Sequence, residues 1–81
     1  MSKSLYSVKD TVRGVFNPPF VEHNDETAVR AFNFSCKESP FRLDLALYKL
    51  ADFDEDTGKI TLFEDVKFLT YFSEVVEDAK Q

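Results

Sequence analysis

Cys36 is the only cysteine in this chain, and that limits most strongly how the chain can fold. An intramolecular disulfide needs two cysteines, so none can reinforce the small core of an 81-residue chain. Stability must come from apolar packing, and the chain carries nine Phe and three Tyr, each of which buries a large area. The length and the lack of repeats or linker-like segments predict a single domain over residues 1–81.

Acidic and basic residues are unevenly distributed around a formal net charge of −5. Residues 1–49 hold seven basic and six acidic side chains, whereas residues 50–81 hold three basic and nine acidic ones. This asymmetry is compatible with a first half that binds a partner and a second half that keeps the protein solvated. The simpler interpretation is that the acidic residues only solubilise a hairpin and a tail.

Several segments have the composition of β-strands. Residues 5–10 alternate around β-favouring side chains, and residues 12–16 form a second short extended piece. Pro18 and Pro19 remove two backbone donors, so they predict a rigid corner leading into residues 20–22. Residues 47–53 and 60–63 flank a polar turn with Gly58 near its end, which predicts a β-hairpin with a G1-type bulge.

Residues 24–37 carry the signals of an α-helix. Asn24 is a good N-cap, and Asp25 and Glu26 place negative charge at the positive end of the helix dipole. The body is expected over residues 27–37, because Pro40 disfavours continuation, and residues 40–45 could form a short helical turn.

The faces of this helix predict its environment. Four residues recur at helical spacing and should meet the core: Ala28, Val29, Phe32 and Cys36. Phe34 lies on the opposite side, where a loop or another subunit would have to cover it.

The tail is predicted to be helical over residues 66–81, because apolar residues recur at helical spacing: Leu69, Phe72, Val76 and Ala79. β-Branched and aromatic residues are mediocre helix formers, so an extended conformation of residues 66–69 stays open. The whole pattern predicts an α+β fold, with a small antiparallel sheet of three or four strands packed against one main helix and a possible C-terminal helix.

The acidic hairpin resembles a calcium loop only in part. Asp52, Asp54 and Asp56 fall at positions 1, 3 and 5 of an EF-hand-like loop. That motif needs glycine at position 6 and glutamate at position 12, where this chain has Thr57 and Phe63. A solvated turn is therefore the favoured interpretation.

The sequence supports a catalytic site no better than it supports a calcium site. His23 and Cys36 are the sole soft metal ligands and lie thirteen positions apart, and nothing in this spacing places them within hydrogen-bond reach. The two glycines, Gly14 and Gly58, do not form a phosphate-binding loop. We expect no enzyme activity, no metal and no cofactor.

Binding of nucleic acid is supported by the first half of the chain. Proteins that bind single strands combine basic side chains with aromatic faces on which bases stack. The candidate contacts are Lys3, Tyr6, Lys9, Arg13, Arg30, Arg42 and Lys49, with Phe16 and Tyr48 as aromatic neighbours. The negative net charge opposes this interpretation, so protein–protein interaction is an equally open alternative.

The order of five short motifs resembles the small nonstructural protein of gokushoviruses, the single-stranded DNA bacteriophages of the microvirus family. The motifs are YSVKD at residues 6–10, FNPPF at 16–20, AVRAF at 28–32, YKLADFD at 48–54 and DTGK at 56–59. The resemblance covers roughly residues 5–65 and rests on motif order and spacing.

The resemblance implies a non-virion, non-enzymatic protein of the infected bacterium that binds DNA. Such proteins are described as acting when replication switches from duplex copying to single-strand synthesis for packaging. The alternative is an interaction module that binds the viral replication initiator or a host replication factor without contacting DNA.

The expected partners and location follow from the size and composition of the chain. The sequence contains no run of eighteen apolar residues that could span a membrane, and no apolar run follows Met1. We therefore expect a protein of the host bacterial cytoplasm without membrane partners. A thin core would gain from a symmetric homodimer. The candidate interface residues are Phe34, Phe68, Tyr71 and Phe72.

Overall fold

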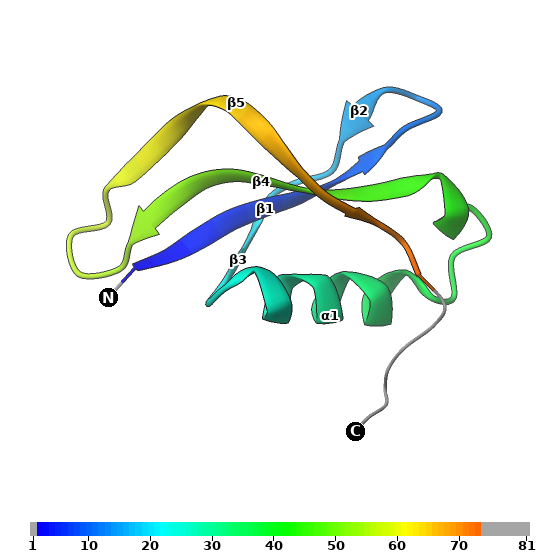
Figure 1. Cartoon of the computed structure of the whole chain (residues 1–81), viewed down its shortest axis with the longest axis horizontal. Helices are drawn as coiled ribbons and strands as arrows, with labels where there is room; N and C mark the ends of the chain where they lie inside the picture. Colours follow the sequence, from blue (N-terminus) through cyan, green and yellow to red (C-terminus); the bar gives the residue numbers. More distant parts are fainter. Residues whose placement is uncertain (1, 74–81) are drawn as a thin grey trace.

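The computed structural model describes residues 2–73, which form one α-helix and a curled, half-barrel-like antiparallel sheet (Figure 1). The elements follow in the order β1 (Ser2–Asp10), β2 (Val15–Phe16), β3 (Phe20–Glu22), α1 (Asp25–Cys36), the 3-10 turn η1 (Arg42–Asp44), β4 (Leu45–Asp54) and β5 (Ile60–Tyr71). This confirms the predicted α+β class and the short helical turn before β4.

The sheet has five strands, in the order β2-β1-β4-β5, with β3 also paired to β1. We expected three or four strands, and the difference arises at the proline corner. Pro18 and Pro19 interrupt the chain between β2 and β3, so the two short strands pair separately with β1, at Lys9–Asp10 and at Ser4–Tyr6. The extended piece predicted over residues 12–16 is shorter than expected, because a turn with Gly14 at φ 74° occupies residues 11–14.

The hairpin between β4 and β5 is confirmed. Gly58 has φ 78°, a left-handed conformation that glycine adopts without a steric penalty. Its backbone N–H donates to the carbonyl oxygen of Asp54 over 2.7 Å, and the Asp54 side chain accepts from the N–H of Asp56 over 2.9 Å. Asp54 therefore organises the turn, because its carbonyl oxygen and its side chain both accept from backbone N–H groups of the loop.

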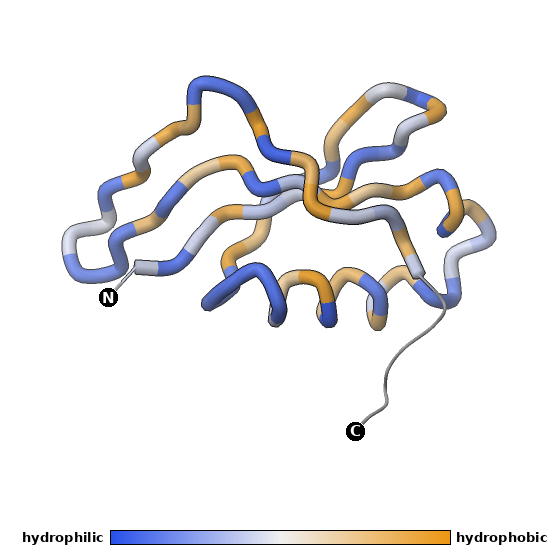
Figure 2. The backbone as a smooth tube through the Cα atoms, viewed as in Figure 1, coloured by the Kyte–Doolittle hydropathy of each residue, from blue (hydrophilic) through white to orange (hydrophobic). Residues whose placement is uncertain are grey.

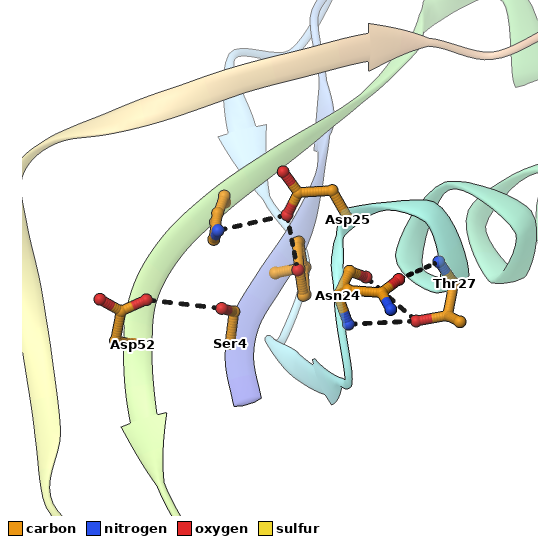
Figure 3. A network of polar contacts seen from close by, with 7 residues as sticks. Ser4, Asn24, Asp25, Thr27 and Asp52 are labelled. Carbon is orange, nitrogen blue, oxygen red and sulfur yellow. Dashed lines mark hydrogen bonds and ion pairs between the residues drawn. The ribbon is translucent and has the colours of Figure 1, made fainter. Parts of the chain in front are cut away.

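The helix begins where its cap predicts. The Asn24 side chain accepts from the backbone N–H of Thr27 over 2.9 Å, and the Thr27 hydroxyl lies 3.3 Å from the N–H of Asn24 and accepts from it. This reciprocal pair is a capping box (Figure 3). The first turn also carries Asp25 and Glu26, as the dipole argument requires.

The core lies between α1 and one face of the sheet, and Figure 2 shows hydrophobic positions alternating with hydrophilic ones along the strands. Ala28 and Phe32 have no exposed surface, and Val29 and Cys36 pack against the core as predicted. The strands contribute Tyr6, Val8 and Leu47 to the core, and Phe72, which directly follows β5, also belongs to it.

The predicted helical tail is wrong over residues 66–71, which form the second half of β5; residues 74–81 lie outside the described part. The helix-like spacing of the apolar residues Leu69 and Phe72 has another cause. β5 is irregular opposite β4, because Tyr48 pairs with Phe68 while Leu47 pairs with Thr70, so Leu69 is an extra residue. This bulge places Leu69 and Phe72 on the core side at a spacing of three, which resembles a helical repeat.

Candidate nucleic-acid interface

The sheet face that points away from α1, here called the outer face, carries a row of aromatic side chains. Tyr6, Val8 and Leu47 point to the core, and side chains alternate along a strand. Lys9 on β1 and Tyr48 on β4 therefore lie on the outer face. Strand pairing aligns Phe16 with Lys9 and Phe68 with Tyr48.

The rings touch one another from one side of the sheet to the other. The ring centroids of Phe16 and Tyr48 are 5.2 Å apart, those of Tyr48 and Phe68 are 5.7 Å apart, and those of Phe68 and Tyr71 are 4.9 Å apart. We call these four residues the aromatic row. It runs across β2, β4 and β5, passing over β1 at Lys9.

Lys9 supplies positive charge within this row. Its ammonium lies 5.4 Å from the centroid of the Phe16 ring and 5.6 Å from that of Tyr48. Both distances fall within the range of cation–π attraction. The ammonium is thereby held at the surface between two rings, where a phosphate could reach it.

Much of the row faces solvent. The exposed fractions are 42% for Phe16, 47% for Phe68 and 61% for Tyr71, whereas Tyr48 is half-buried between its neighbours. Single exposed apolar residues are common on proteins, whereas adjoining exposed rings make this face a candidate binding surface. Flat rings with a cation between them suit a ligand that has both aromatic bases and phosphates.

The predicted DNA contacts do not form one group. Of that set, Lys9 lies in the row, and Arg13 lies in the exposed turn that joins β1 to β2. Lys3 forms an ion pair with Glu55 over 3.2 Å. Arg42 lies over the Phe72 ring, and Arg30 is exposed on α1.

Two aromatic candidates have a structural role. Tyr6 has no exposed surface, so its ring cannot stack on a base in this conformation. Phe72 is 8% exposed and packs edge-on against Phe32, so it belongs to the core. Phe34 is exposed on α1, as the helix pattern predicted, and Phe68 and Tyr71 belong to the aromatic row.

Lys49 belongs to a polar network beside the start of α1. The Tyr6 hydroxyl donates to an Asp25 carboxylate oxygen over 2.8 Å, and the Lys49 ammonium lies 3.2 Å from the same oxygen (Figure 3). The Tyr6 hydrogen bond and then Lys49 lower the pKa of Asp25, against the opposing effect of its burial. Burial of the phenol, followed by its bond to Asp25, raises the pKa of Tyr6 to about 12. The network fastens α1 to β1 and β4.

Tyr6→Phe tests this network through pH. The folded state favours the neutral phenol of Tyr6. Its contribution to the free energy of unfolding is therefore complete below the ordinary pKa of 10.0 and is lost as the pH rises through the raised pKa of about 12. At neutral pH we expect Tyr6→Phe to cost about 0.5–1.5 kcal/mol of unfolding free energy. Urea unfolding should show this difference shrinking above pH 10. Two stability curves that stay parallel through this range would contradict the assignment.

His23 and Cys36 are placed too far apart to act together. His23 precedes α1 and Cys36 is its last residue, so a helix of 12 residues separates them by about 18 Å. Burial raises the pKa of the Cys36 thiol, which disfavours the reactive thiolate. Among residues 2–73, no three His, Cys, Asp or Glu side chains are grouped in a way that could hold a metal ion.

All four residues of the row are candidates from the sequence, but for two different roles. Phe16 and Tyr48 were neighbours of the DNA candidates, and Phe68 and Tyr71 were candidates for a dimer interface. The signal that unites them is strand register, since Lys9 pairs with Phe16 and Tyr48 with Phe68. The register between Tyr48 and Phe68 lies beside an irregularity in the pairing of β4 with β5, which no local pattern marks.

Comparison with known proteins gives a family assignment. Within residues 2–73 no helix is both long and apolar enough to cross a membrane. Searches among curated proteins and among solved structures gave no significant match. Residues 3–75 match the family described as phage ORF5 protein. This match covers most of the chain, so the chain belongs to the phage ORF5 protein family.

Proposed function

We propose that this phage protein binds single-stranded DNA on the outer face of its sheet. The observation that carries the proposal is the aromatic row of Phe16, Tyr48, Phe68 and Tyr71, with the Lys9 ammonium held between two of the rings. Stacking of bases on aromatic side chains, with basic groups along the backbone, is the general mode of single-strand binding.

The charge distribution favours stacking over phosphate contacts as the main source of affinity. The chain has a net charge of −5; the Lys9 ammonium lies against the row, and Arg13 lies in the turn that follows β1. The salt dependence of binding reports the number of phosphates neutralised, with a slope of about −0.7 per phosphate for single strands. We therefore expect a slope of about −1 to −2 per copy.

The biological role follows from the resemblance to the gokushovirus nonstructural protein. We propose that the protein acts without catalysis in the host bacterial cytoplasm, during the switch from duplex replication to synthesis and packaging of the single-stranded genome. A surface that holds unpaired bases by stacking would favour the single strand over the duplex, whose bases are already stacked.

Reversal of the Lys9 charge tests the proposal. Fluorescence anisotropy of a labelled oligothymidine at low salt should show saturable binding, weakened about tenfold or more by Lys9→Glu. The matched control is Lys37→Glu, because the Lys37 ammonium also lies over an exposed ring, 4.7 Å from the centroid of Phe34, but on the helix. The control should bind DNA like the unmodified protein. Absent binding, or an equal loss in both variants, would contradict the proposal.

The alternative is a protein-binding module that contacts the viral replication initiator or a host replication factor. One observation favours it: three large apolar side chains are exposed on α1 and on the segment that follows it, namely Phe34, Phe41 and Leu43. If the unmodified protein showed no saturable binding to the oligonucleotide at low salt, this alternative would replace the DNA-binding proposal.

A further inference from the structure

The turn that joins β1 to β2 presents two exposed side chains on a hydrogen-bonded backbone. Val12 is 74% exposed, and Arg13 beside it is exposed as well. The Asp10 carboxylate accepts from the backbone N–H of Val12 over 3.0 Å and from that of Arg13 over 3.1 Å. The carbonyl oxygen of Asp10 accepts from the N–H of Gly14 over 2.7 Å, and Gly14 has φ 74°. These bonds fix the backbone beneath both side chains.

The turn is also anchored to the rest of the fold. The backbone N–H and the hydroxyl of Thr11 both donate to the carbonyl oxygen of Asp44, over 2.9 and 2.8 Å. In Figure 1 the turn rises away from α1, so it projects on the side of the outer face. Because its backbone is already ordered, a ligand that contacts the turn would lose little affinity to ordering it.

The turn between β4 and β5 has the same framework. Gly58 takes the place of Gly14, with φ 78°, and its N–H donates to the carbonyl oxygen of Asp54 over 2.7 Å. The Asp54 carboxylate accepts from the N–H of Asp56 over 2.9 Å, just as the Asp10 carboxylate accepts from the N–H two residues further on. Both turns consist of an aspartate, three other residues and a glycine.

The β1–β2 turn therefore does not need Val12 or Arg13 in order to form. The same positions of the β4–β5 turn hold Asp56 and Thr57, which are of types that turns commonly contain. The turn framework thus explains neither the exposed apolar side chain nor the cation beside it. A contact with a ligand would account for both.

The turn adjoins one end of the aromatic row. Phe16 lies two residues beyond Gly14 and pairs with Lys9 on the edge strand β2. Val12 follows Lys9 by three residues, which separates them by no more than about 10 Å along the chain. A DNA strand stacked along the row would pass over Phe16 and meet the turn there.

We propose that Val12 and Arg13 contact the first base pair of a duplex, at the point where it opens into the single strand on the aromatic row. This inference rests on the proposed function. A branched aliphatic side chain has no flat face on which an unpaired base can stack, but apolar side chains do act as wedges at base steps. The end of a duplex has an apolar stacked face with phosphates around it, and Arg13 can neutralise a phosphate. The DNA that fits this surface best is therefore a junction of single strand and duplex.

Three kinds of labelled DNA test the preference by fluorescence anisotropy: an oligothymidine, a blunt hairpin duplex, and the same hairpin with an oligothymidine tail of equal length at its 5′ or 3′ end. We expect the tailed hairpin, in at least one polarity, to bind about tenfold more tightly than the oligothymidine, a gain of roughly one stacking contact. The blunt hairpin should bind more weakly than either. The proposal is overturned if neither tail polarity gives a gain, or if the blunt hairpin binds as tightly as the tailed one.

Exchange of the two turn sequences assigns this gain to the β1–β2 turn. Val12→Asp/Arg13→Thr introduces the residues of the other turn and keeps Asp10 and Gly14, so the variant should remain folded. The quantity compared is the ratio of the affinities for the tailed hairpin and the oligothymidine, because a change in net charge affects both. This ratio should fall from about ten to about one.

Two further variants complete the test. Val12→Ser leaves the net charge unchanged and should also remove most of the gain. The matched control is Asp56→Val/Thr57→Arg, which makes the reciprocal change in the β4–β5 turn and should leave the ratio as it is in the unmodified protein. A ratio that survives in Val12→Asp/Arg13→Thr, or that falls equally in the control, would contradict the contact.

The possible outcomes separate this inference from the proposed function. If the oligothymidine binds and the tailed hairpin gives no gain, the junction contact is wrong and the proposed function stands. If the unmodified protein does not bind the oligothymidine, the proposed function fails, and the junction contact fails with it.

Discussion

Replacing Tyr48 and Phe68 together with alanine is expected to weaken binding of single-stranded DNA by at least about 30-fold. Stacking of a base on an aromatic side chain contributes about 1–3 kcal/mol per base, and the change removes two adjacent platforms. The two rings are 5.7 Å apart between centroids and form the middle of the aromatic row, so their loss also separates Phe16 from Tyr71. Anisotropy with a labelled oligothymidine measures the effect directly.

Two further variants make this result specific. Phe34→Ala/Phe41→Ala also removes two exposed rings, but these lie on α1 and on the segment after it, so DNA affinity should be unchanged. Tyr48→Phe keeps the aromatic face and should retain most of the affinity. If the Phe34/Phe41 variant lost as much affinity as the Tyr48/Phe68 variant, the outer face would not be the DNA site.

Phe32→Ala should lower the free energy of unfolding by about 3–5 kcal/mol. Phe32 has no exposed surface, and its ring packs edge-on against Phe72 at 6.3 Å between centroids. Proteins have only about 0.05–0.15 kcal/mol of stability per residue, so for a chain of this size the loss is a large share of the total. Circular dichroism during urea unfolding should show the unfolding midpoint of the variant at a much lower urea concentration.

The neighbouring positions on α1 provide the comparison. Phe34 lies two residues further along the same helix and is 70% exposed, so Phe34→Ala should change stability by no more than about 0.5 kcal/mol. Phe32→Leu keeps part of the buried volume and should remain folded, with a smaller loss. Equal losses at positions 32 and 34 would contradict the placement of the core.

The elements that the sequence predicted well are those specified by neighbouring residues. The Asn24 cap and the apolar spacing of Ala28 and Phe32 identify α1 because the hydrogen bonds and the buried face of a helix are local. The β4–β5 hairpin follows in the same way from its polar turn and Gly58.

The tail was predicted incorrectly because a bulged strand and a helix can share one apolar spacing. Without the extra residue at Leu69, the side chains of residues 66–72 would alternate strictly, and the strand pattern would be visible. Three residues of this segment are of types that favour strands, namely Val66, Phe68 and Tyr71. Pairing with β4 stabilises the segment as a strand.

The site was only partly predictable for a similar reason. Lys9 and Lys49 look equivalent in the sequence, yet Lys9 lies on the outer face while Lys49 binds Asp25 beside the helix. Tyr6 and Tyr48 likewise look equivalent, and one is buried while the other forms part of the row. The side of the sheet that each residue occupies depends on the pairing of distant strands and on the irregularity between β1 and β4, where Tyr6 pairs with Lys49 and Leu5 with Ala51.

Binding of single-stranded DNA to the outer face can be mapped residue by residue in an NMR titration. Backbone amide signals of the unmodified protein would be followed while oligothymidine is added. We expect small shifts along the solvent side of α1 and the largest shifts at Lys9, Phe16, Tyr48, Phe68 and Tyr71. Shifts concentrated on α1 and η1, or no shifts at saturating oligonucleotide, would contradict it.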